Sequence, residues 1–233
     1  MKTLLISLAL AFTLGCLTSS AGAQQTARTQ QRQQQQTDRA QQMNANQVQV
    51  AVEQMAAQSD PLQLIYRKDV QRDLKLELGQ RNKLDNFHDR QLADLRQARI
   101  QNRRNNAPLI EMEEKQRKDT QDKIDELLTD AQKARLKQIA LQLQGESAVL
   151  MAAVQKELAV TPDQVQQFAS LQAARDAKIS ALQNSDQMPR RGQNMADQVK
   201  QIQKELNEGI AAVLTEEQAQ KLKKLFGDPF KAG

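Results

Sequence analysis

The sequence predicts an all-α protein, and three observations carry that prediction. The chain has no tryptophan, one tyrosine and eight glycines among 233 residues. It is rich in Leu, Ala, Gln, Lys, Arg and Glu, which favour helix. Apolar residues also recur at steps of three and four, which indicates one-sided helices that bury a narrow seam against one another. We therefore expect antiparallel long-helix hairpins.

Residues 1–23 have the pattern of a signal peptide. Lys2 is followed by the apolar run Leu4 to Leu14, which is too short to span a bilayer permanently, and Ala21-Gly22-Ala23 offers small residues for cleavage. We expect export to the periplasm or cell envelope. The alternative is a lipoprotein site at Leu14-Gly15-Cys16, which would anchor the chain at Cys16 and is the only expected route to membrane association. With simple cleavage after residue 23, the mature chain has no cysteine.

Residues 24–60 form a glutamine-rich leader. Gln33 to Gln36 are an uninterrupted run, and almost no large apolar residue precedes Val48. Such a segment buries too little surface to offset its conformational entropy, so we expect a disordered, flexible leader. Its last third, Gln47 to Ala57, has alternating Val and Ala and could form a helical turn or two.

The remainder reads as two tandem helical-hairpin repeats, residues 61–146 and residues 147–233. Two stretches correspond in both halves: Val70-Gln71-Arg72-Asp73-Leu74 with Val154-Gln155-Lys156-Glu157-Leu158, and Leu128-Thr129 with Leu214-Thr215. Each repeat is expected to hold a short approach helix, two long helices joined by a polar loop, and a closing helix. The core is thin and aliphatic, so we also expect a homodimer. The predicted core stripes are Leu84, Phe87, Gln91 or Leu92, Leu95 and Ala98; Leu136, Ile139 and Leu143; Val165, Phe168, Leu171, Ile179 and Leu182; and Met195, Val199, Ile202, Leu206, Ile210 and Val213.

Three Thr-x-x-Gln phrases predict where helices begin. In each, the threonine oxygen accepts from a first-turn amide, and the glutamine three residues later reaches back to the amide of the threonine. Pro162 strengthens the middle copy because the first helical position needs no N–H donor. In the first repeat, Glu77 stands where threonine is expected, so that helix lacks a hydroxyl cap. The three phrases are Thr129 with Gln132, Thr161 with Gln164, and Thr215 with Gln218.

Two loops carry the candidate binding residues. A basic run enters the first polar loop, and paired arginines mark the corresponding loop of the second repeat, so two basic tips could engage acidic proteins, anionic headgroups or wall polymers. The alternative is that this charge only keeps polar loops soluble. A second candidate surface is the amphipathic seam, where aliphatic side chains beside Gln, Lys and Met make an adaptable groove. The candidate arginines are Arg96, Arg99, Arg103, Arg104, Arg190 and Arg191.

Several classes of function find no support in the residues. The only histidine, His88, has no second histidine or mature cysteine with which to hold a metal, so we expect no metal site and no cofactor. There is no nucleophile beside a base and no glycine-rich phosphate loop, so we expect no catalytic site. The formal charge of +5 is small, and the arginines are not interleaved with aromatics, so no nucleic-acid partner is expected.

The capped phrases resemble the LTxxQ-motif helical proteins of the bacterial envelope, the Spy/CpxP group. The residues that carry the resemblance are Leu128-Thr129-Asp130-Ala131-Gln132, Val160-Thr161-Pro162-Asp163-Gln164 and Leu214-Thr215-Glu216-Glu217-Gln218. The resemblance implies a non-enzymatic, ATP-independent chaperone or stress-response modulator that binds partly unfolded or envelope proteins. Those proteins form cradles as dimers, whereas this chain is a tandem. The alternative is a structural or adaptor protein of the envelope with one fixed partner or self-assembly.

Overall fold

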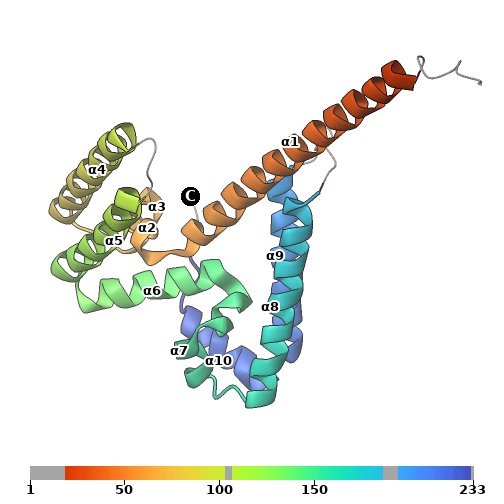
Figure 1. Ribbon diagram of the computed structural model, residues 1–233. Helices are drawn as coiled ribbons and strands as arrows, with labels where there is room; N and C mark the ends of the chain where they lie inside the picture. Colours follow the sequence, from red (N-terminus) through yellow and green to blue (C-terminus); the bar gives the residue numbers. More distant parts are fainter. Residues whose placement is uncertain (1–18, 103–106, 186–193, 232–233) are drawn as a thin grey trace, which may run out of the picture.

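The computed structural model describes residues 19–102, 107–185 and 194–231, and these are all-α, with no strand among them (Figure 1). The all-α prediction is therefore confirmed. The helices are α1 (Ser19–Ser59), α2 (Pro61–Leu64), α3 (Lys68–Asp73), α4 (Leu78–Gln101), α5 (Ala107–Leu127), α6 (Asp130–Gln144), the 3-10 helix η1 (Gly145–Leu150), α7 (Ala152–Glu157), α8 (Pro162–Gln183), α9 (Met195–Val213) and α10 (Glu216–Phe226).

The prediction of a flexible leader is wrong, because α1 is a long helix that packs on α8 and α9 (Figure 1). Its buried residues, Ala40, Asn44, Val48 and Ala51, follow at steps of four, four and three, which places them on one helix face. Composition misled the prediction because small and amide side chains can line a close helix contact with only a few larger apolar residues, such as Val48, among them. Residues 1–18 of the expected signal peptide, including Cys16, lie outside the described residues.

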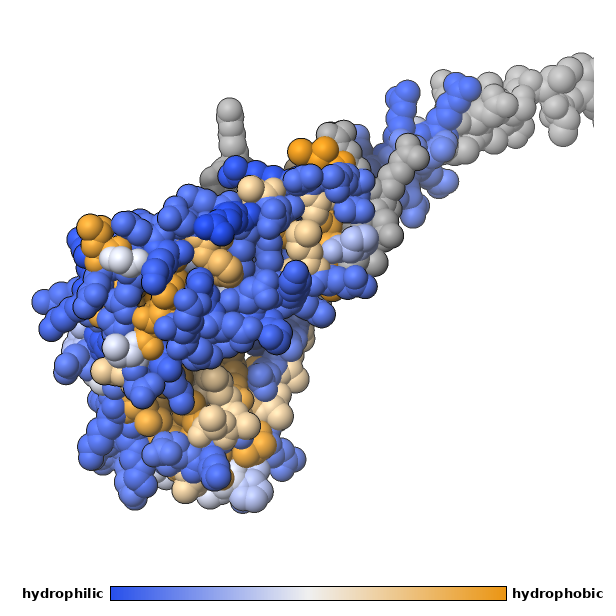
Figure 2. Space-filling model, turned by 90° about the vertical axis from the view of Figure 1, so that its left-hand side faces the viewer, coloured by the Kyte–Doolittle hydropathy of each residue, from blue (hydrophilic) through white to orange (hydrophobic). Residues whose placement is uncertain are grey.

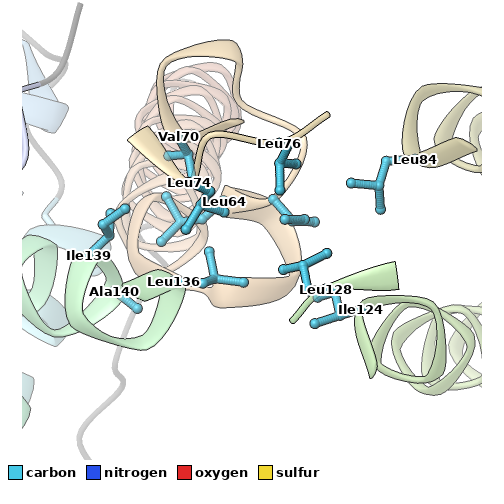
Figure 3. Close-up of a cluster of buried hydrophobic side chains, with 11 residues drawn as sticks. Leu64, Val70, Leu74, Leu76, Leu84, Ile124, Leu128, Leu136, Ile139 and Ala140 are labelled. Atoms are coloured by element: carbon cyan, nitrogen blue, oxygen red, sulfur yellow. The ribbon is translucent and has the colours of Figure 1, made fainter. Parts of the chain in front are cut away.

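The first apolar cluster joins α2 through α6 (Figure 3). It gathers side chains from the two short helices, the start of α4, the end of α5 and the middle of α6. Leu64 and Val70 are fully buried, although they come from helices of only four and six residues. Short helices are marginal alone, so this burial stabilises them. The cluster consists of Leu64, Ile65, Val70, Leu74, Leu76, Leu84, Ile124, Leu128, Leu136, Ile139 and Ala140.

The second apolar cluster joins the end of α6 to η1 and helices α7 through α10. Its members are Leu141, Ala148, Val149, Val154, Leu158, Phe168, Leu206, Ile210 and Leu222. Several stand 84 or 86 positions after members of the first cluster, as Val154 does for Val70 and Ile210 does for Ile124. A third, smaller cluster places Val48 and Ala51 of α1 against Met195 and Val199 of α9.

The chain end returns to α6 and joins the two large clusters. Arg135 makes a bidentate ion pair with Asp73 at 2.7 and 3.1 Å and also donates to the backbone carbonyl of Asp228 at 2.7 Å. Gln142 donates to the carbonyls of Phe226 and Asp228 and accepts from the Phe230 amide. The segment after α10 is therefore fixed along α6, beside the first cluster.

Helices α4 and α5 lie side by side, as do α8 and α9 (Figure 1). Most predicted stripe residues are buried or half-buried, and in α9 Met195, Val199, Ile202, Leu206 and Ile210 are all buried. Two assignments are wrong. Leu143 and Val165 are exposed, because each lies to one side of the stripe that its helix buries.

Candidate functional site

All three predicted capping boxes are present, and a fourth stands at the start of α4. In α6, α8 and α10 the threonine oxygen accepts from the glutamine amide, and the glutamine side chain accepts from the threonine amide. At α4, Glu77 takes the place of threonine, and its own amide donates to Gln80 Oε1 at 2.8 Å. A carboxylate therefore caps this helix in place of the missing hydroxyl.

The glutamines of these boxes pair across the fold, which the sequence did not predict. Gln164 Nε2 donates to Gln218 Oε1 at 2.7 Å, and Gln218 Nε2 donates to Gln164 Oε1 at 3.0 Å. The remaining donors reach the backbone carbonyls of Val213 and Leu158. Both side chains are buried, and a buried amide with every group paired holds its neighbours rigidly.

The same pair recurs between Gln80 and Gln132. Gln80 Nε2 donates to Gln132 Oε1 at 3.0 Å, and the reverse hydrogen bond is 3.3 Å long. The other donors reach the carbonyls of Leu127 and Leu74. These carbonyls stand 86 and 84 positions before Val213 and Leu158, so each half has the same junction of four helix ends. The Thr-x-x-Gln residues thus serve the fold.

The structure describes two of the six candidate arginines, Arg96 and Arg99. Arg96 is exposed on α4, and Arg99 lies 3.8 Å from Glu113 of α5 with both side chains more than half exposed. An ion pair so open to solvent contributes little to stability. Arg103, Arg104, Arg190 and Arg191 lie outside the described residues, so the two predicted basic tips stay predictions.

A polar network fills the seam between α4 and α5. Gln91 donates to Thr120 Oγ1 at 3.0 Å and to the Gln116 carbonyl at 3.1 Å, while Gln116 donates back to the Gln91 carbonyl. Tyr66 contributes its hydroxyl at 3.3 Å from Gln91, and burial raises the pKa of this phenol although the Thr120 hydrogen bond opposes the shift. In α9, the positions that correspond to Gln116 and Thr120 are the buried Ile202 and Leu206. The seam of α4 and α5 is therefore the more polar of the two.

His88 stacks on Tyr66 with ring centroids 3.9 Å apart. Its Nδ1 atom is buried and has no hydrogen-bond partner among the described residues. Burial lowers the pKa of His88, although Asp85 and Asp89 oppose the shift. Asp85 is itself held by Lys68 at 2.7 Å. Within the described ranges, no three His, Cys, Asp or Glu side chains gather as a metal site would require.

A pocket of about 290 Å³ opens at this seam. Apolar and polar groups line it in similar measure, and the stacked His88 and Tyr66 rings are among them. Figure 2 looks onto the side of the molecule that carries α4, α5 and α6, and apolar patches there interrupt a hydrophilic surface. The lining residues come from α2, the turn after it, α4 and α5: Leu62, Gln63, Tyr66, His88, Gln91, Leu92, Leu95, Glu113, Gln116, Arg117 and Thr120.

A second pocket of similar size lies between α1, α6, η1, α8 and α9. Four of its lining residues belong to α1: Val52, Met55, Ala56 and Ser59. The hydroxyl of Ser147 and the amides of Gln203 and Asn207 form a hydrogen-bonded group on its other side. Helix α1, from the N-terminal part of the chain, thus forms one wall of this pocket.

The chain matches no protein-family model, no curated protein and no solved structure. Among the residues that the structure describes, no helix is both long enough and apolar enough to cross a membrane.

Proposed function

We propose that this protein is a non-enzymatic chaperone or stress-response modulator of the cell envelope, similar to the Spy/CpxP group. It is a tandem of two helical-hairpin units, residues 61–146 and 147–233, exported by a signal peptide at residues 1–23. It binds exposed apolar or acidic surfaces of partly unfolded proteins and needs neither nucleotide nor metal.

The observation that carries this proposal is the half-open seam between α4 and α5. Its walls combine aliphatic side chains, amides and the charged side chains of Glu113 and Arg117 around a pocket. Near the far end of the hairpin, Ile100 and Ile110 are 66 and 57 % exposed. Exposed aliphatic groups beside flexible polar ones suit weak binding to many chains without a strict sequence requirement.

An envelope adaptor with one fixed partner is the second candidate. The fully hydrogen-bonded amide pairs favour this candidate, since they hold each helix junction rigidly. The pairs are Gln164 with Gln218 and Gln80 with Gln132. A rigid surface suits one complementary partner better than many unlike ones. The adaptor is expected to bind one partner at fixed stoichiometry, or to self-assemble, without binding unfolded chains.

The aggregation of a slowly unfolding protein, followed by light scattering without nucleotide, tests the chaperone proposal. Suppression near equal molar ratio is the expected result, and no suppression with several test proteins would contradict the proposal. In a variant with Arg103, Arg104, Arg190 and Arg191 changed to Ser, lost suppression would assign binding to the tips. A control changes four exposed lysines to Ser, which removes the same charge elsewhere: Lys137, Lys156, Lys200 and Lys223.

The expected homodimer and the expected export need separate tests. Sedimentation velocity of the purified protein measures the mass in solution, and a mass of one chain at all concentrations would contradict the dimer. The N-terminal residue of the exported protein distinguishes cleavage before Gln24 from a lipid-modified Cys16.

A further inference from the structure

The two pockets occupy corresponding places in the two halves of the chain. Gln63 and Gln91 line the first pocket, and Ser147 and Arg175, each 84 positions later, line the second. On α5 and α9 the correspondence is 86 positions, from Glu113 to Val199 and from Arg117 to Gln203. The difference between the pockets lies in the helix α1, which forms a wall of the second pocket only.

Residues at corresponding positions in the two halves are buried where α1 lies over them and exposed where it does not. Val199 is 2 % exposed beneath α1, whereas Glu113 at the corresponding place is exposed. Ala196 is half-buried and packs against the third cluster, whereas Ile110 is 57 % exposed. The face of α4 and α5 that corresponds to the α1 contact is therefore exposed, and α1 does not line the pocket there.

Helix α1 shows what chemistry suits such a groove. Its apolar residues pack on α9, and its amides Gln41 and Asn44 donate to the carbonyls of Asn184 and Ser185 at the end of α8, at 3.4 and 2.9 Å. Carbonyls in the last turn of a helix have no intrahelical partner, so amide donors are well placed there. The corresponding residues, 84 positions earlier, are Ile100 and Gln101 in the last turn of α4.

One change in charge distinguishes the two grooves. Val48 of α1 lies in the same apolar cluster as Val199. Where the second half has Val199, the first half has Glu113, which forms an exposed ion pair with Arg99 at 3.8 Å. A helix that binds the first groove should therefore carry a cation where α1 carries Val48, since opposite charges steer and select partners.

We propose that the groove formed by α2, α4 and α5 binds one amphipathic helix of another protein, with a stripe of small aliphatic residues, amide side chains at one end and a basic residue opposite Glu113. The helix lies as α1 lies on α8 and α9. This proposal does not depend on the proposed function. Such a helix can come from a fixed adaptor partner or from a partly folded chaperone substrate.

A fluorescent peptide of residues 40–59 with Val48→Lys is the probe, and fluorescence anisotropy with the full chain measures its binding. We expect it to bind more tightly than the unchanged peptide. Ile110→Asp should weaken its binding about tenfold, because it places a charge on α5 at the position that corresponds to Ala196 in the α1 contact. Glu113→Lys should reverse the preference between the two peptides. Both positions are exposed, so neither change should unfold the protein.

Val165→Asp is the matched control, because Val165 is an exposed aliphatic residue, 41 % exposed, that lies on α8 and outside the proposed groove of α2, α4 and α5. It should leave the dissociation constant unchanged. The proposal is overturned if neither peptide binds at millimolar concentration, or if Ile110→Asp and Glu113→Lys bind both peptides as the unchanged protein does. The peptide assay contains no aggregating protein, so this proposal and the chaperone proposal can fail independently.

Discussion

Gln164 and Gln218 exchange two hydrogen bonds across the junction of α8 and α10, at 2.7 and 3.0 Å. Each Oε1 also accepts from the amide of its own cap threonine, Thr161 or Thr215. Each Nε2 reaches a backbone carbonyl as well. Removing one glutamine therefore leaves several groups of its partner and of the backbone unpaired in a buried place.

We predict that Gln164→Ala and Gln218→Ala each lower the free energy of unfolding by about 2 kcal/mol, because a buried amide loses its partner. The double variant should lose less than the sum of the two, since the second substitution removes groups that the first has already left unpaired. Urea unfolding measures all three. Gln166→Ala, at an exposed position of α8, is the control and should change little. Strictly additive losses would show that the pair does not act as a unit.

Lys75 and Ala159 have left-handed backbones, with φ of 50° and 49°, and they stand at corresponding places after α3 and α7. Leu76 N donates to the Gln71 carbonyl and Val160 N to the Gln155 carbonyl, the pattern of a helix end that favours glycine. We predict that Lys75→Gly and Ala159→Gly each stabilise the fold by about 0.5–1 kcal/mol, net of the greater chain entropy of glycine.

Thermal unfolding checks the two glycine variants. Lys156→Gly, inside α7, is the contrasting variant and should destabilise by about 1 kcal/mol, because glycine in a helix interior carries an entropic cost. If all three substitutions destabilise, the left-handed positions carry no strain that glycine relieves.

His88 should make stability depend on pH near its ordinary pKa of 6.5. Burial lowers its pKa in the folded state, so the unfolded chain takes up the proton first as the pH falls. Stability is then lost as the pH falls through 6.5 and towards the lower pKa of the folded state. His88→Phe keeps a ring against Tyr66 but does not titrate. We predict a flatter stability profile for this variant, measured by urea unfolding across that range. Equal profiles would contradict the lowered pKa.

Helix α1 should be held on the rest of the protein by its buried stripe. Val48 is fully buried, so Val48→Asp places an unpaired charge inside the contact. We predict that amides of residues 40–55 exchange with solvent much faster in this variant, while those of α6 keep their protection. Val50→Asp, at an exposed position of α1, is the control. Equal exchange of residues 40–55 in Val48→Asp and in the unchanged protein would contradict the role given to this stripe.

The sequence predicted what depends on local patterns. Thr161 marked a helix start because capping acts over four residues, and Met195 through Ile210 followed one helix face. It did not predict that Gln164 and Gln218 pair, because they lie 54 positions apart and only the fold brings them together. The packing of α1 was missed for a related reason. Its stripe relies on Ala40, Asn44 and Ala51, which become a contact surface only when a groove of matching shape is present.

The pocket between α4 and α5 could not be predicted from sequence patterns either. Tyr66, Gln91 and Thr120 come from three separate segments, and Gln and Thr are common on exposed helix faces. The one available signal lay in the comparison of the two halves, in which Gln116 and Thr120 stand where Ile202 and Leu206 maintain the apolar stripe of α9. Polar residues in the α4–α5 seam, at positions that are apolar in the α8–α9 seam, indicate that the two seams have different neighbours.

The most direct test of the proposed function is hydrogen exchange of the full chain in the presence of an unfolding protein whose aggregation it suppresses. We predict added protection along α4 and α5, where the groove is open, and little change along α8 and α9, which α1 covers. Suppressed aggregation with protection confined to α8 and α9, or with none in α4 and α5, would contradict the assignment of binding to the open seam.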